Sequence, residues 1–251
     1  MNRRPVPEPP QGTGRTMGRT RRPSSLRGPA AALAAAAIAA GYVLAARPRL
    51  LRWGATAQEA AGPLPGDELV RVPRMQSTRA VTINAPASDV WPWLVQLGSG
   101  RGGMYSYDVL ENAAGLGMVS ADRILPEFQQ LDVGDAIPLG RGLAIPVRRL
   151  EAGSVLGLGG TMDPRTGGPV PAGAAAGGPR LQCGWTFVLQ PLGARTTRLL
   201  SRTRYDYAPL PLGLLLRPAL EPLQFLMERR MLLGIKSRAE GHGPHQGRAG
   251  A

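Results

Sequence analysis

Hydrophobic and polar positions alternate along several short stretches of the chain. Within residues 78–86, Arg79, Val81 and Ile83 alternate with smaller or polar residues, which predicts a strand that ends at an Ala-Pro pair. Similar patterns of apolar and polar residues predict further strands over 136–139, 143–151, 154–160, 180–192 and 195–207. A short turn separates the last two of these strands, so we expect them to form an antiparallel hairpin.

Elsewhere the apolar residues recur at helical spacing. Residues 88–98 are predicted to form a short helix, with Ser88 as its N-cap and Gly98 as the glycine that ends it. A second short helix is expected over 106–117, and the longest amphipathic pattern predicts a C-terminal helix over 211–240. The order is a strand, two short helices, a run of antiparallel strands and one long helix. This order predicts an α+β fold in which the long helix covers the sheet.

The N-terminal part of the chain has a different texture. Residues 1–28 are rich in Arg, Pro and Gly without apolar periodicity, which predicts disorder. Residues 29–46 carry no charge and have basic flanks, a pattern that favours a single-pass membrane anchor. A cleaved signal peptide and an Ala-rich soluble helix are the alternatives. We then expect a linker over 47–77, a globular domain over 78–240 and a disordered tail over 241–251.

The placement of charge narrows the classes of partner. The chain carries a net charge of +13, but residues 1–52 hold ten Arg and one Glu, or +9, and residues 53–240 hold nineteen basic and sixteen acidic groups, or +3. The near-balanced domain argues against nucleic-acid binding. The heavier basic count before the apolar segment weakly favours a cytoplasmic N-terminus, although three Arg follow that segment.

Few residues suited to metal or nucleophilic chemistry are present. Cys183 is the only cysteine, and both histidines, His242 and His245, lie in the tail. We therefore expect neither a metal site nor a catalytic triad in the domain. Cys183 itself is expected to be a small buried apolar residue on its strand.

One motif suggests a cofactor. Gly98, Gly100 and Gly103 spell G-x-G-x-x-G, the pattern of a dinucleotide-binding turn. That turn needs a strand before it and a helix after it. Here a helix is predicted before the glycines and no βαβ unit follows, so we expect a loop and no bound cofactor.

Several segments together resemble a known superfamily. The chain is similar to the SRPBCC (START-like, helix-grip) superfamily over roughly residues 65–240, in the segments TINAPASDVWPWLVQLGSGRGGMYSYDVLEN, SADRILPE, GWTFVLQPLGARTTRLLSRTR and FLMERRMLLGIKSRAE. The closest resemblance is to bacterial members that have an N-terminal hydrophobic segment and no assigned activity. It implies a curved antiparallel sheet that grips the C-terminal helix around an apolar cavity. Members bind lipids, sterols, polyketides or other hydrophobic molecules, and some are cyclases or hydrolases.

The loop after the glycines is the first candidate for a ligand site. Tyr105, Tyr107 and Asp108 would contact a ligand's polar end if this loop lies at the mouth of a cavity. The alternative is that both rings complete the core. Asp108 and Glu111 could form an acid/base pair, and the alternative is a solvated helix face.

Large apolar side chains and two strand arginines complete the candidate set. Trp91, Trp93, Trp185, Phe187, Phe225 and Met227 are expected to fill the core or to line a cavity. Arg202 and Arg204 share one strand face, where they would hold an anionic headgroup or face solvent.

These patterns lead to one functional expectation. The chain is expected to be a membrane-tethered protein that binds a hydrophobic small molecule or lipid, with no catalytic residue assigned. The expected ligand-binding residues are Trp91, Tyr105, Tyr107, Asp108, Trp185, Phe187, Arg202 and Met227. Two alternatives stay open, an enzyme of the polyketide cyclase/dehydrase type and a membrane-anchored structural domain without a ligand.

Overall fold

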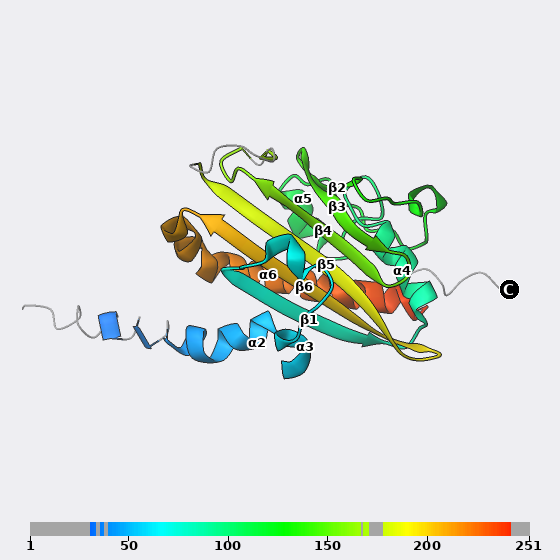
Figure 1. Cartoon of the computed structure of the whole chain (residues 1–251), viewed down its shortest axis with the longest axis horizontal. Helices are drawn as coiled ribbons and strands as arrows, with labels where there is room; N and C mark the ends of the chain where they lie inside the picture. The colour runs from blue at the N-terminus through cyan, green and yellow to red at the C-terminus, as the bar shows by residue number, and fades with distance from the viewer. Residues whose placement is uncertain (1–30, 34–35, 38–39, 167, 171–177, 242–251) are drawn as a thin grey trace, which may run out of the picture. The chain divides into compact units, whose positions relative to one another are not determined.

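The computed structural model describes residues 31–33, 36–37, 40–166, 168–170 and 178–241 (Figure 1). The chain divides into two compact units, Met1–Gly41 and Tyr42–Ala251. The segment 1–28 and the tail residues 242–251, both expected to be disordered, lie outside the described residues. The fold and the site described below belong to the second unit.

Six antiparallel strands form one sheet in the order β1-β6-β5-β4-β3-β2. The strands are β1 (Met75–Ile83), β2 (Ala136–Gly140), β3 (Leu143–Glu151), β4 (Val155–Met162), β5 (Arg180–Gly193) and β6 (Thr196–Ala208). The expected hairpin is confirmed, because β5 and β6 pair along their whole length around a short turn. Strand β1 pairs with β6 and begins three residues earlier than expected.

The helical elements are η1 (Tyr42–Ala46), α2 (Arg47–Leu51), α3 (Ala57–Ala61), η2 (Asp67–Val70), α4 (Ala87–Val95), α5 (Asp108–Ala113), η3 (Pro126–Phe128) and α6 (Leu210–Ala239). Helix α6 packs against β1, β6 and α4, and it runs behind the curved sheet in Figure 1. The α+β expectation is confirmed, and the arrangement is the helix grip that the resemblance implies.

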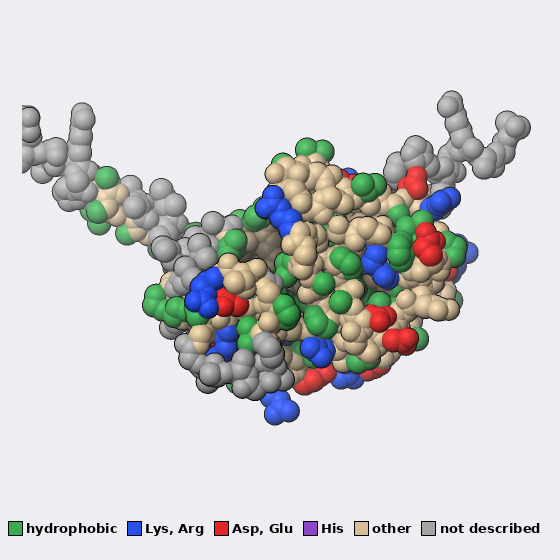
Figure 2. Space-filling view, turned by 90° about the horizontal axis from the view of Figure 1, so that it is seen from above, with side chains coloured by type: hydrophobic (Ala, Val, Ile, Leu, Met, Phe, Trp, Pro, Cys, Tyr) green, Lys and Arg blue, Asp and Glu red, His purple; other side chains and the backbone are tan. Residues whose placement is uncertain are grey.

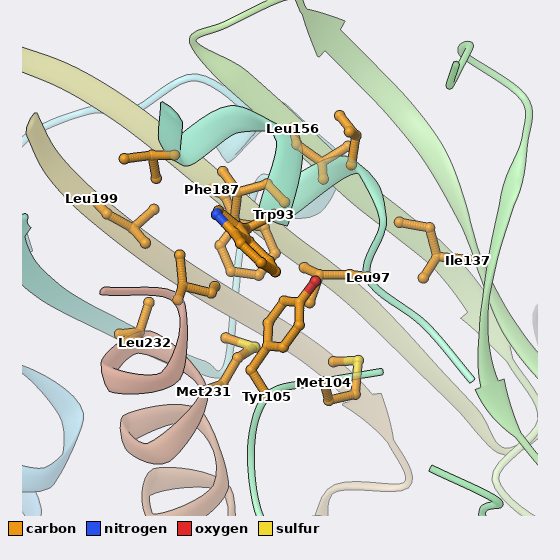
Figure 3. Packing of buried hydrophobic residues seen from close by; sticks show 14 of the residues in the cluster. Trp93, Leu97, Met104, Tyr105, Ile137, Leu156, Phe187, Leu199, Met231 and Leu232 are labelled. Carbon is orange, nitrogen blue, oxygen red and sulfur yellow. The ribbon is translucent and has the colours of Figure 1, made fainter. Parts of the chain in front are cut away.

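The main core lies between the sheet and α6. Side chains on a strand alternate between its two faces, so Phe187 and Leu189 of β5 point inward while Thr186 and Val188 point outward. Figure 3 shows how the inward groups meet the helix. Leu156, Phe187 and Leu199 come from the sheet and Met231 and Leu232 from α6, with the Trp93 and Tyr105 rings between them. Burying each such side chain fully stabilises the fold by about 1.5–3 kcal/mol.

Residues 54–70, here called the outer strap, cover the opposite face of the sheet. Ala55 and Leu64 of the strap pack on a small cluster of Ala80, Val155, Val188 and Leu200. Helix α3 within the strap begins with a capping box, in which Thr56 Oγ1 accepts from the Glu59 amide (3.1 Å) and Glu59 Oε2 accepts from the Thr56 amide (2.7 Å). The stretch 47–77, expected to be a linker, thus contains helical turns packed on the sheet and the start of β1.

Helix α4 departs from its expected ends. It begins at Ala87 after Pro86, whose extended backbone places it as the N-cap, while Ser88 lies inside the helix and bonds Asp89. The helix ends at Val95, so Gly98 does not terminate it. The expectation for both ends was wrong by one to three residues.

The three glycines of the G-x-G-x-x-G pattern build a closed turn. Gly98 and Gly103 exchange two backbone hydrogen bonds of 2.9 and 3.0 Å. The φ angles of Gly98, Gly100 and Gly103 are +126°, +71° and +74°, values that favour glycine. No helix begins at Gly103, because α5 starts at Asp108. The pattern therefore forms a loop, as expected.

Two features of the sequence, the apolar segment 29–46 and the distribution of charge, can be compared with the structure. Among the described residues, no helix combines the length and the apolar character needed to cross a membrane. Part of the segment 29–46 lies outside the described residues. On the face drawn in Figure 2, basic and acidic side chains are interspersed and do not form one basic stripe.

Candidate functional site

A pocket of about 160 Å³ lies between α6 and the inner face of the sheet. Three parts of the chain build its wall: α6, the strands β5 and β6, and the loop and helix that follow the glycine turn. The lining residues are Met104, Ser106, Glu111, Trp185, Tyr205, Gln224, Met227, Glu228 and Met231.

The sequence explains why these side chains meet. Gln224, Met227, Glu228 and Met231 follow the i, i+3, i+4, i+7 spacing that places residues on one helix face. Cys183 of β5 belongs to the core on the inner face of the sheet. Trp185 lies two positions further along the same strand, and Tyr205 of β6 is paired with Cys183, so both aromatic side chains lie on this inner face as well. The result is a wall of aromatic rings and thioethers that also contains two carboxyl groups.

Trp185 and Met227 line this pocket, where we expected ligand-binding residues. The indole Nε1 of Trp185 donates a hydrogen bond to Ser201 Oγ (2.9 Å), which fixes the ring against the sheet. Phe187 is fully buried behind it, with 4.9 Å between the two ring centroids. Phe187 therefore supports the Trp185 ring and is not itself part of the pocket wall.

Tyr105 belongs to the core, the alternative left open for it. Its side chain is 1% exposed, and its ring meets that of Trp93 edge-on at 5.8 Å (Figure 3). Tyr105 Oη accepts a hydrogen bond from Gln96 Nε2 (2.8 Å), and burial raises the pKa of the phenol. Its neighbours leave no room for a ligand's polar end.

Tyr107 and Asp108 make their contacts outside the pocket wall. Tyr107 is the N-cap residue of α5, and the Arg230 guanidinium lies 5.8 Å from its ring centroid. Both Asp108 carboxylate oxygens accept hydrogen bonds from Ser120, from its amide (2.8 Å) and from its hydroxyl (2.6 Å). Asp108 thus ties α5 to the following loop.

Arg202 lies on the outer face, away from the pocket. Its guanidinium donates to Asp67 Oδ2 (2.9 Å) and to the backbone carbonyls of Glu59 (2.6 Å) and Gly62 (2.9 Å) in the outer strap. It is only 2% exposed. The strap already occupies these donors, so they are not directed at the pocket, and a role of Arg202 in holding an anionic ligand stays a prediction.

Trp91 lines a different hollow. This second pocket has a volume of about 360 Å³ and is bounded by Trp91, Val95, Gln129, Gln130, Leu131, Asp132, Leu150 and Ala152. Several of these residues, including Gln130 and Asp132, are solvent-exposed. Its wall contains only one aromatic side chain, so the pocket beside α6 is the better candidate for an apolar ligand.

Sequence reasoning missed a buried ion pair, one member of which, Glu228, lines the pocket. Arg79 of β1 pairs with Glu228 of α6, and both side chains are at most 4% exposed. Arg79 also donates to Ser77 Oγ (3.1 Å) and to the Leu50 carbonyl (3.0 Å). Burial raises the pKa of Glu228, while the Arg79 charge and hydrogen bonding act in the opposite direction.

Glu111 is the second carboxyl group in the wall. The sequence left Glu111 either as an acid/base partner of Asp108 or on a solvated helix face, and the structure shows that it is only 6% exposed. Ser106 Oγ donates to Glu111 Oε1 (2.6 Å), whereas Oε2 is buried and has no hydrogen-bond partner among the residues that the structure describes. Burial raises the pKa of Glu111, and the neighbouring Asp108 charge raises it further.

Neither a metal site nor a reactive thiol was expected from the sequence. Within the described ranges, no group of three or more His, Cys, Asp or Glu side chains is arranged to hold a metal ion. Cys183 is buried, and burial raises the pKa of its thiol to about 12, so it is not a reactive thiolate.

Comparisons with known proteins give structural likeness only. No family model matches the chain, and no curated protein matches it. Among solved structures, the chain is similar to the aromatase/cyclase Zhui from Streptomyces sp. R1128, with 17% identity over 70% of this chain and 99% of that one and a TM-score of 0.37. It is also similar to truncated norcoclaurine synthase from Thalictrum flavum, with 14% identity over 65% and 91% and a TM-score of 0.36.

A third similar structure is a hypothetical protein from Helicobacter pylori, with 12% identity over 74% of this chain and 99% of that one and a TM-score of 0.41. The class of fold is stated from the chain's own strand order and the position of α6. By these criteria the domain has the helix-grip architecture expected from the SRPBCC resemblance.

Proposed function

We propose that this domain binds a small hydrophobic molecule in the pocket between α6 and the sheet. The observation that carries the proposal is the pocket wall, in which Trp185, Met227 and Met231 surround about 160 Å³ of space. Apolar and aromatic walls with a few polar groups are typical of small-molecule sites. The small volume limits the ligand to a compact one.

Titration of the full chain with 1-octanol by calorimetry tests this proposal. We expect saturable binding with one molecule per chain, and loss of binding in Met227→Trp, because the larger ring fills the pocket. Leu220→Trp places the same ring on an exposed position of the same helix and is expected to leave binding unchanged. Equal binding by Met227→Trp and the unmodified chain, or no saturable binding at all, would contradict the proposal.

Acid/base catalysis is a second candidate, of the polyketide cyclase/dehydrase type. The observation in its favour is Glu111, a carboxyl group in an apolar pocket with a raised pKa and a free oxygen. If Glu111 transfers protons, the chain should accelerate deuterium uptake at the α-carbons of 2-octanone in D₂O, and Glu111→Gln should abolish the acceleration. A rate equal to that of buffer alone would exclude this enolisation chemistry.

Tethering to a membrane is a separate proposal that rests on the sequence. Residues 29–46 are eighteen residues without a charge, preceded and followed by arginines. We expect the chain to stay in the membrane fraction after carbonate washing. Release of the intact chain into the soluble fraction would contradict tethering and would leave the ligand proposal untouched.

A further inference from the structure

Three glutamate side chains are buried among the described residues, and only two of them have a cationic partner. Glu221 is 1% exposed and accepts two hydrogen bonds from Arg47, of 2.7 and 2.9 Å. Glu228 is 4% exposed and pairs with Arg79. Glu111 is 6% exposed and forms no ion pair with any residue in the described part of the chain.

Both carboxyl groups of the pocket wall have one oxygen that lacks a hydrogen-bond partner among the described residues, Glu111 Oε2 and Glu228 Oε1, but only Glu111 also lacks an ion pair. Ser106 satisfies Glu111 Oε1, but Oε2 is buried and accepts nothing from the described residues. Removing an ionised carboxylate from water without a counter-charge costs several kcal/mol. A positive group supplied from outside the chain would remove this cost.

The rest of the wall suits such a group. The lining residues include two glutamates and no Lys, Arg or His, and the Arg79 charge is already engaged by Glu228. The rings of Trp185 and Tyr205 lie in the same wall, and aromatic faces attract cations. The thioethers of Met227 and Met231 provide apolar contact for the remainder of a ligand.

We propose that the pocket selects a small amphiphilic amine, whose ammonium group binds Glu111 Oε2 while its apolar body lies against Trp185 and the methionines. This inference rests on the proposed binding function and names the chemical class of the ligand. It makes Glu111 the residue that determines specificity.

Three probes with the same eight-carbon chain test the inference: n-octylamine, 1-octanol and octanoate, each titrated by calorimetry at pH 7 into the full chain. Octylamine is expected to bind at least tenfold more tightly than octanol, and octanoate more weakly than both. This comparison uses the unmodified chain, so it does not depend on a variant that folds.

The variant Glu111→Gln tests whether Glu111 is the residue that causes the preference for octylamine over octanol. The amide keeps the size of the side chain and removes its charge, so we expect a loss of tenfold or more in octylamine affinity and less than twofold in octanol affinity. Glu127→Gln, on an exposed position of η3, is the matched control and is expected to keep the amine preference. Retention of far-UV circular dichroism and of the urea midpoint shows that each variant is folded.

The other possible outcomes separate the amine inference from the proposed binding of a hydrophobic molecule. Equal affinity for octylamine and octanol, or an amine preference that survives in Glu111→Gln, overturns the amine inference and leaves the binding function standing. A preference for octanoate overturns it as well. If none of the three probes binds, the proposed binding function itself fails.

Discussion

Gly234 of α6 lies against the backbone of Tyr105. A Cβ atom added to Gly234 would come within 2.4 Å of the Tyr105 carbonyl oxygen and within 2.9 Å of its Cβ. Real Cβ atoms do not approach backbone atoms this closely, so only glycine lets the helix and the loop meet here. This contact holds the loop that carries Ser106 beside the face of α6 that lines the pocket.

Gly234→Ala is expected to destabilise the fold by about 1–3 kcal/mol, because the added methyl group overpacks the contact and forces α6 and the loop apart. Urea denaturation measures the change in the free energy of unfolding. Gly193→Ala is the control, since a Cβ there meets nothing within 4 Å. Equal stability of Gly234→Ala and the unmodified chain would show that the contact is not tight.

The Arg79–Glu228 pair predicts a non-additive pair of substitutions. Arg79→Met leaves Glu228 buried without its counter-charge and should cost about 3–5 kcal/mol. The double variant Arg79→Met with Glu228→Gln should recover a large part of this loss, because no unpaired charge remains. A double-mutant cycle from urea unfolding measures the coupling, and additive effects would contradict a direct interaction.

The outer strap predicts a loss of stability in acid. The Arg198 guanidinium binds both Glu59 oxygens at 2.8 Å and lowers the pKa of Glu59 from 4.5 to about 2. Because the pKa is lower in the folded state, the contribution of Glu59 is fully present above about pH 4.5 and is lost as the pH falls toward 2. Because solvent screens this half-buried ion pair, we expect Glu59 to contribute only about 1–2 kcal/mol to the free energy of unfolding.

The measurement is the difference in unfolding free energy between the unmodified chain and Glu59→Gln at pH 6 and at pH 2.5. We expect a clear difference at pH 6 that shrinks at pH 2.5. Glu127→Gln removes an exposed carboxyl group and controls for the change in net charge. A difference that stays constant with pH would mean that the ion pair does not stabilise the strap.

The fold could be predicted from the sequence because its signals are local. Strands and helices can be predicted from the spacing of apolar residues along the chain, as in the alternation over 143–151 and 180–192 and the helical spacing over 211–240. The observed strands and helix lie within a few residues of these limits. The start of α4 was predicted with Ser88 as N-cap, whereas the helix has Pro86 as its N-cap.

The site could be predicted only in part. Arg79 shares a strand face with Val81 and Ile83, so its burial could have been anticipated from the alternation. Its partner could not, because Glu228 reaches it only through the docking of α6 on the sheet. Likewise, the sequence placed Arg202 on one strand face, but only the folded strap decides that this face is covered.

The most direct test of the pocket uses its methionines as reporters. In full-length chain labelled with ¹³C at the methionine methyl groups, bound 1-octanol should give intermolecular NOEs to Met104, Met227 and Met231, which line the pocket. It should give none to Met75, Met118 or Met162, which lie elsewhere in the domain. NOEs from these other methionines with none from the pocket residues, or no NOE at all at saturating octanol, would contradict the proposal that the helix-grip pocket is the ligand site.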